Sequence, residues 1–107
     1  MPFTNTAWDG AAVESSLDAD DYCAVCLIDE NESGNEKVKG LCKLPVRATP
    51  NGPYNVNAIH AATGAHGILA VKASPDAKRK AARKLVSLYS EMKEEAPEGV
   101  RRIAGAR

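Results

Sequence analysis

Four side chains in this sequence have the right chemistry to bind a metal ion together: Cys23, Cys26, Cys42 and His60. Three thiolates and one imidazole are a common ligand set for structural zinc, and Cys23 and Cys26 have the CxxC spacing of many zinc sites. The residues between and after this pair are apolar, whereas zinc-binding CxxC pairs usually lie on a tight turn. Free cysteine otherwise behaves as a small buried hydrophobic residue. We therefore expect thiols packed in the core and no metal or cofactor, with zinc as the weaker alternative.

A cysteine nucleophile with a histidine base is the second chemistry that these residue types permit. Cys26 or Cys42 could in principle be activated by His60. The sequence shows no nearby oxyanion loop and no Asn or Asp placed to orient the histidine. His60 lies between Ile59 and Ala61, which is typical of a helical histidine hydrogen-bonded at the edge of a core. We predict that the chain is not an enzyme.

Binding chemistry is indicated at two other places. The run Lys78-Arg79-Lys80 with Arg83-Lys84 puts five cations early in a predicted helix, where the helix dipole and like-charge repulsion disfavour them. A solvated face is the usual explanation, and an acidic partner surface is the other. Trp8 either forms a turn with its neighbours or inserts into a partner pocket. The candidate partner-binding residues are Phe3, Trp8, Arg79 and Arg83.

Charge and hydropathy exclude several classes of partner. Lys and Arg number 14, as do Asp and Glu, so no net field attracts nucleic acid or an anionic membrane. No apolar run approaches the roughly 20 residues that a membrane span requires. The N-terminus lacks the features of a signal peptide and the number of cysteines is odd, so we expect synthesis in a reducing cytoplasm without a disulfide framework.

Three helices are predicted to position these residues. The clearest one runs from Pro75 to about Glu95, with Ser74 as its N-cap and an apolar stripe at helical spacing. Asp18 caps a second helix that ends near Asp29. Asn55 or Asn57 caps a short third helix that ends at Thr63, before Gly64.

The segment from Lys37 to Val46 is predicted to be extended or an edge strand, because Pro45 cannot occupy a central strand position. The 107 residues allow one domain. We expect an extended N-terminal arm at 1–16, a globular helical domain at 17–97 and a C-terminal tail at 98–107. The predicted fold class is mainly α, a small three-helix domain with an irregular extended segment and an arm, and α+β is the alternative.

Five short segments together resemble a small domain found in tailed phages, chiefly those of actinobacterial hosts. They are Trp8-Asp9-Gly10, Ala24-Val25-Cys26-Leu27-Ile28-Asp29, Lys43-Leu44-Pro45-Val46-Arg47, Asn57-Ala58-Ile59-His60-Ala61-Ala62 and the stretch from Ala77 to Tyr89. The resemblance covers residues 8 to about 98, and Cys23, Gly67-Ile68-Leu69 and the Arg-rich tail depart from it. In that family the domain occurs alone or appended to prohead-protease-like head proteins.

The resemblance implies a role in phage heads without a chemical activity of its own. We expect a virion structural protein, either a capsid decoration (cement) protein or a minor head protein. Its expected partners are major capsid subunits and copies of itself, with no membrane or nucleic acid. The alternatives are an internal, scaffold-associated head-assembly factor and a small zinc- or nucleic-acid-binding regulator.

Overall fold

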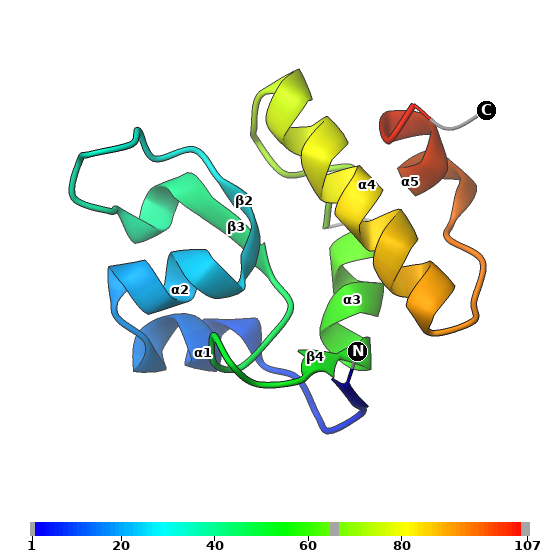
Figure 1. Cartoon of the computed structure of the whole chain (residues 1–107), viewed down its shortest axis with the longest axis horizontal. Helices are drawn as coiled ribbons and strands as arrows, with labels where there is room; N and C mark the ends of the chain where they lie inside the picture. The colour runs from blue at the N-terminus through cyan, green and yellow to red at the C-terminus, as the bar shows by residue number, and fades with distance from the viewer. Residues whose placement is uncertain (1, 65–66, 106–107) are drawn as a thin grey trace.

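The computed structural model describes residues 2–64 and 67–105, which form five α-helices and two small sheets (Figure 1). Helices account for 47% of the chain and strands for 13%. The prediction of a mainly α, three-helix domain is therefore wrong, and the fold is an α+β mixture. In chain order the elements are β1 Phe3–Thr4, α1 Gly10–Ser16, α2 Ala19–Val25, β2 Cys26–Asp29, the 3-10 helix η1 Lys39–Leu41, β3 Cys42–Pro45, β4 Tyr54–Asn55, α3 Val56–Thr63, α4 Pro75–Glu91 and α5 Glu98–Ile103.

The second predicted helix is shorter than expected because its C-terminal part is a strand. Asp18 caps α2 by accepting a 2.8 Å hydrogen bond from the backbone N–H of Asp21. After Val25 the chain becomes extended, and β2 pairs antiparallel with β3, placing Asp29 opposite Cys42. Burial of the β-branched Ile28 and the backbone pairing favour the strand over another helical turn.

The N-terminal arm is fixed to the rest of the protein, and its last seven residues are helical. Strand β1 pairs in parallel with β4, and the N–H of Tyr54 donates to the carbonyl of Pro2. Residues 10–16, predicted as part of the arm, form α1, because the side chain of Asp9 caps the helix by accepting from the N–H of Ala12.

The longest helix, α4, confirms the start of the clearest predicted helix, although it ends at Glu91 and not near Glu95. Ser74 caps it by accepting from the N–H of Ala77, and Pro75 is its first residue. Within the region 98–107, predicted as a C-terminal tail, Glu98–Ile103 form α5, and residues 106–107 lie outside the described part of the chain. Helix α5 packs against α4, with Val100 almost completely buried.

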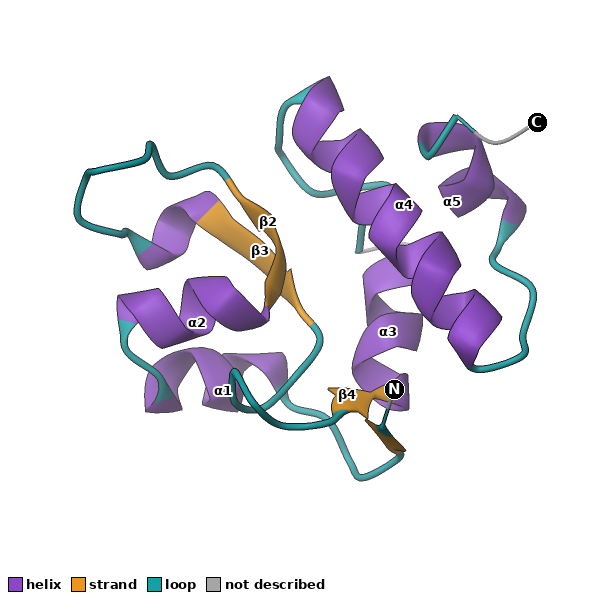
Figure 2. Cartoon of the chain, in the orientation of Figure 1, coloured by secondary structure: helices purple, strands orange, loops and turns teal. Residues whose placement is uncertain are grey.

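The core has two parts, one on either side of the β2–β3 sheet. Figure 1 shows α1, α2, β2 and β3 on one side of the molecule and α3, α4 and α5 on the other. Figure 2 shows the β2–β3 pair between α2 and α4, and β2 packs directly on α4. The larger cluster is centred on Ile28, Val46, Ile59, Ile68, Leu85, Leu88 and Val100, and the smaller one contains Tyr22, Cys23, Val25 and Cys42. Within the described ranges, every helix is too short or too polar to cross a bilayer.

Candidate functional site

A groove of about 200 Å³ lies where the end of α2, the β2–β3 sheet and α4 meet. The start of β2 contributes apolar surface to it, and two cations and a tyrosine also line it. The lining residues are Ala24, Val25, Cys26, Leu27, Val46, Arg47, Tyr54 and Lys84. We call this site the cationic groove.

The two cations of the cationic groove are held against one aromatic ring. The guanidinium carbon of Arg47 lies 4.8 Å from the ring centroid of Tyr54, and the ammonium nitrogen of Lys84 lies 5.3 Å from it. Both distances are within the roughly 6 Å range of cation–π attraction. Arg47 is placed by an isolated antiparallel bridge to Tyr54, and Lys84 is placed by α4. The ring itself is supported by Phe3, whose centroid is 6.2 Å away.

Neither cation has a carboxylate partner within residues 2–64 and 67–105, although five other basic side chains there do. In the same part of the chain, the buried Nε of Arg47 has no hydrogen-bond partner. An unpaired buried donor costs about 1–3 kcal/mol. Two neighbouring positive charges with an unused donor are complementary to an anionic group, and guanidinium binds carboxylate or phosphate with two parallel hydrogen bonds.

The cysteine in this groove is not an activated nucleophile. Burial raises the pKa of the Cys26 thiol to about 12, although a hydrogen bond from Tyr22 opposes the change. Burial likewise raises the pKa of the Tyr22 hydroxyl above its ordinary value. Cys26 is therefore a neutral thiol at physiological pH and contributes apolar surface to the groove.

The structure does not bring together the four residues considered as the weaker zinc alternative, Cys23, Cys26, Cys42 and His60. Cys23 and Cys42 form a disulfide with a Cα–Cα distance of 5.3 Å, whereas Cys26 lines the cationic groove as a free thiol. His60 lies on α3, with its Nε2 3.3 Å from the carboxylate of Glu94.

The expectation of buried thiols without a disulfide is therefore wrong for Cys23 and Cys42. They are separated by 19 positions, and they meet only because the register of β2 and β3 puts Cys42 beside the end of α2.

The predicted partner-binding residues are distributed over several structural roles. Phe3 and Trp8 are half-buried and pack against the larger core cluster. Arg79 forms an ion pair with Asp76, and Arg83 donates from Nε to the carbonyl of Ala104, so that it connects α4 to the end of α5.

Trp8 also lines a second groove, of about 290 Å³, together with Leu44, Pro45 and Ala61. The lining residues of this groove carry no charge. Leu44 has a positive φ of 64°, a left-handed conformation that is rare for a residue with a branched side chain.

Sequence reasoning missed Arg47 and Tyr54 and included Lys84 only as part of a charged run. Arg47 and Tyr54 flank the turn around Pro50–Gly52 and form an isolated antiparallel bridge across it. Pairing across a turn of this length is not specified by short-range sequence signals.

The chain matches no protein-family model, and neither a curated protein nor a solved structure shows detectable similarity to it.

Proposed function

We propose that this chain is a non-enzymatic structural protein of a bacteriophage head. It binds the lattice of major capsid subunits in the virion and stabilises it, as a decoration protein or a minor capsid protein. Two observations support the proposal: the five segments that resemble a phage head-associated domain, and a surface groove whose chemistry suits an acidic group of a protein partner.

The cationic groove is the observation that carries the proposal. Arg47 and Lys84 converge on Tyr54 beside the apolar surface of Leu27, so the groove can take a carboxylate together with the apolar stem of its side chain. A hydrogen bond to a charged group contributes about 1.5–3 kcal/mol at best, and solvent reduces this contribution at a surface. One such contact is weak, but many copies on a repeating lattice give avidity.

The experiment compares two charge-matched double variants for binding to heads that lack the protein. The first, Arg47→Gln with Lys84→Gln, removes both groove cations. The second, Arg79→Gln with Lys80→Gln, removes two exposed cations from the same helix as Lys84 without changing the groove. In co-sedimentation at low salt, we expect the groove variant to bind at least about tenfold more weakly and the control to change less than about threefold.

Two results would contradict the proposal. Equal losses in both variants would show that the cationic groove has no special role, and a loss in the second variant alone would assign binding to Arg79 instead. Quantification of the chain in purified virions supplies the independent test. A copy number matching the lattice supports decoration, whereas absence from mature particles favours the internal assembly factor.

A further inference from the structure

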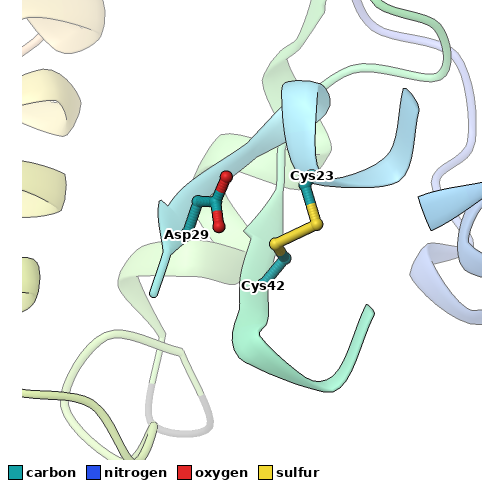
Figure 3. A group of neighbouring side chains, drawn as sticks. All are labelled: Cys23, Asp29 and Cys42. Carbon is teal, nitrogen blue, oxygen red and sulfur yellow. A yellow bond between two sulfur atoms is a disulfide. The ribbon is translucent and has the colours of Figure 1, made fainter. Parts of the chain in front are cut away.

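Three potential metal ligands from three different elements converge outside the cationic groove. Figure 3 shows the carboxylate of Asp29 beside the two sulfur atoms of Cys23 and Cys42. One ligand atom from each residue lies within 4.8 Å of the other two. The β2–β3 register sets this arrangement, because Asp29 and Cys42 are directly paired and Cys23 lies on the adjoining helix α2.

The spacing fits a tetrahedral ion once the disulfide is reduced. Zn–S bonds are about 2.3 Å and Zn–O bonds about 2.0–2.2 Å, so neighbouring ligands on one zinc ion lie about 3.5–3.8 Å apart. Two sulfur atoms bonded to each other are closer than this, so reduction must precede metal binding. The ligand atoms of Cys23, Cys42 and Asp29 already lie within 4.8 Å of one another, which exceeds the ligand spacing on zinc by only about 1 Å.

The surrounding groups suit two thiolates and a carboxylate. The side-chain amide nitrogen of Asn31 lies 3.3 Å from Sγ of Cys42 and 3.6 Å from Sγ of Cys23, and it also donates to Asp29 at 2.9 Å. The same side chain is held in place because its Oδ1 accepts a 2.8 Å hydrogen bond from the N–H of Val38. Such hydrogen bonds around the ligands orient them and typically change metal affinity 10- to 100-fold.

The charges around the three ligands also favour a divalent cation. Lys37 forms an ion pair with Asp29, so two thiolates, one carboxylate, one ammonium and one divalent cation sum to zero.

We propose that reduction converts the Cys23–Cys42 disulfide into a Zn²⁺ site in which Cys23, Cys42 and Asp29 are the protein ligands. The sulfur atoms belong to buried residues, whereas the side chain of Asp29 is 26% exposed, so water reaches the fourth position. A dithiol reductant supplies two electrons and two protons to the disulfide and is itself oxidised to a disulfide. Zn²⁺ binding then releases the two thiol protons, and the reverse oxidation expels the ion.

The ion would replace a covalent connection in the fold. In the oxidised chain the disulfide joins α2 to the start of β3. In a reducing cytoplasm, coordination of one ion by residues of α2, β2 and β3 would hold the same three elements together. This inference is independent of capsid binding, because it concerns only residues outside the cationic groove.

The test is a titration of the full chain with Zn²⁺ and with Co²⁺, after reduction by a phosphine and again after reoxidation. A phosphine reduces the disulfide while water supplies oxygen for the phosphine oxide and protons for the two thiols. We expect one equivalent to bind the reduced chain, with thiolate-to-cobalt charge-transfer absorption and release of about two protons per ion. The oxidised chain should bind at least about 100-fold more weakly, because a disulfide is not a thiolate ligand.

Matched variants identify the ligands. Cys23→Ser should weaken binding by at least about 100-fold, and Asp29→Asn, which retains both thiols, by at least about tenfold. Cys26→Ser and Asp21→Asn, which change the same residue types outside the cluster, should change binding less than about threefold.

Several results would overturn the inference. They are the absence of stoichiometric Co²⁺ or Zn²⁺ binding to the reduced wild-type chain, equal binding by the oxidised chain, and an effect of Cys26→Ser as large as that of Cys23→Ser. If Cys23→Ser does not fold, Asp29→Asn alone decides the ligand assignment, and unchanged affinity in that variant refutes it.

Discussion

Asn55 is the residue whose replacement tests most directly how the N-terminal segment is fixed to the body. It is the buried polar residue of the described chain, with 4% of its surface exposed. Its Oδ1 caps α3 by accepting from the N–H groups of Asn57 at 2.8 Å and Ala58 at 3.1 Å. Its Nδ2 donates to the carbonyl and the hydroxyl of Thr6 at 3.1 and 3.2 Å. One side chain thus joins the start of α3 to the segment that precedes Trp8.

The cost of Asn55→Ala follows from these four hydrogen bonds. Loss of an N-cap side chain costs about 1 kcal/mol, with a range of about 0.5–2. Loss of the amide removes two further hydrogen bonds, to the hydroxyl of Thr6 and to its carbonyl, which still accepts from Asn57; at about 0.5–1 kcal/mol each they add about 1–2 kcal/mol. We therefore expect the free energy of unfolding to fall by about 2–4 kcal/mol. Asn55→Ser keeps a capping oxygen and should lose only about half of that amount.

Urea denaturation followed by the fluorescence of Trp8 measures these changes, since this is the one tryptophan of the chain. The matched control is Asn57→Ala, because Asn57 is exposed and its amide also donates to the Thr6 carbonyl, at 2.8 Å. Exposure should limit its cost to less than about 1 kcal/mol. A loss below 1 kcal/mol in Asn55→Ala, or equal losses in the two alanine variants, would refute the role assigned to burial and capping.

Three further predictions concern a helix end and the cysteines. Lys93 has φ of 60° directly after α4, where its N–H and that of Glu94 cap the last turn, so Lys93→Gly should raise the unfolding free energy by about 0.5–1 kcal/mol in the same urea assay. The pKa of Cys26, about 12 against an ordinary 9.0, makes its thiolate scarcer at pH 8 in the folded chain. A more basic thiolate is also a better nucleophile, which offsets part of this loss. A disulfide reagent should therefore label Cys26 about 40-fold more slowly in the folded chain than in the urea-unfolded chain, and equal labelling rates would contradict the burial of Cys26. Reduction of the Cys23–Cys42 disulfide, measured by thermal unfolding in a metal chelator, should cost about 3 kcal/mol for a loop of 19 positions, and an unchanged melting temperature would contradict the pairing.

The starts of α2, α3 and α4 were predictable because their signals are local, whereas α1 and α5 were not predicted. Asp18 and Ser74 cap helices in the structure as the sequence predicts, and Asn55, one of the two residues considered for the third cap, is the residue that caps α3. A capping side chain acts on backbone groups two or three residues away, so the sequence window contains both partners. The apolar stripe of α4 is local in the same sense, because helical geometry brings every third or fourth residue to one face.

Strand β3 lies within the segment predicted as extended or an edge strand, but β2 and the candidate site were not predictable in the same way. The run Cys26–Asp29 fits the end of a helix as well as a short strand, and periodicity cannot separate these two states over four residues. Its pairing with Cys42–Pro45 settles the choice, and that pairing joins segments separated by a long loop. The cationic groove depends on this same strand pairing and on the packing of α4, since Arg47 follows β3 and Lys84 comes from α4.

The sequence by itself thus determined where α2, α3 and α4 begin and that the chain carries no net charge. Only the tertiary structure decided that Cys23 and Cys42 form a disulfide beside Asp29. It also decided that the side chains of Arg47 and Lys84 both lie against the ring of Tyr54. The physical reason is the distance along the sequence between the residues that interact. Caps and helical stripes are set by neighbours within one or two turns, whereas strand register and packing of helices on a sheet are set by burial of the whole core.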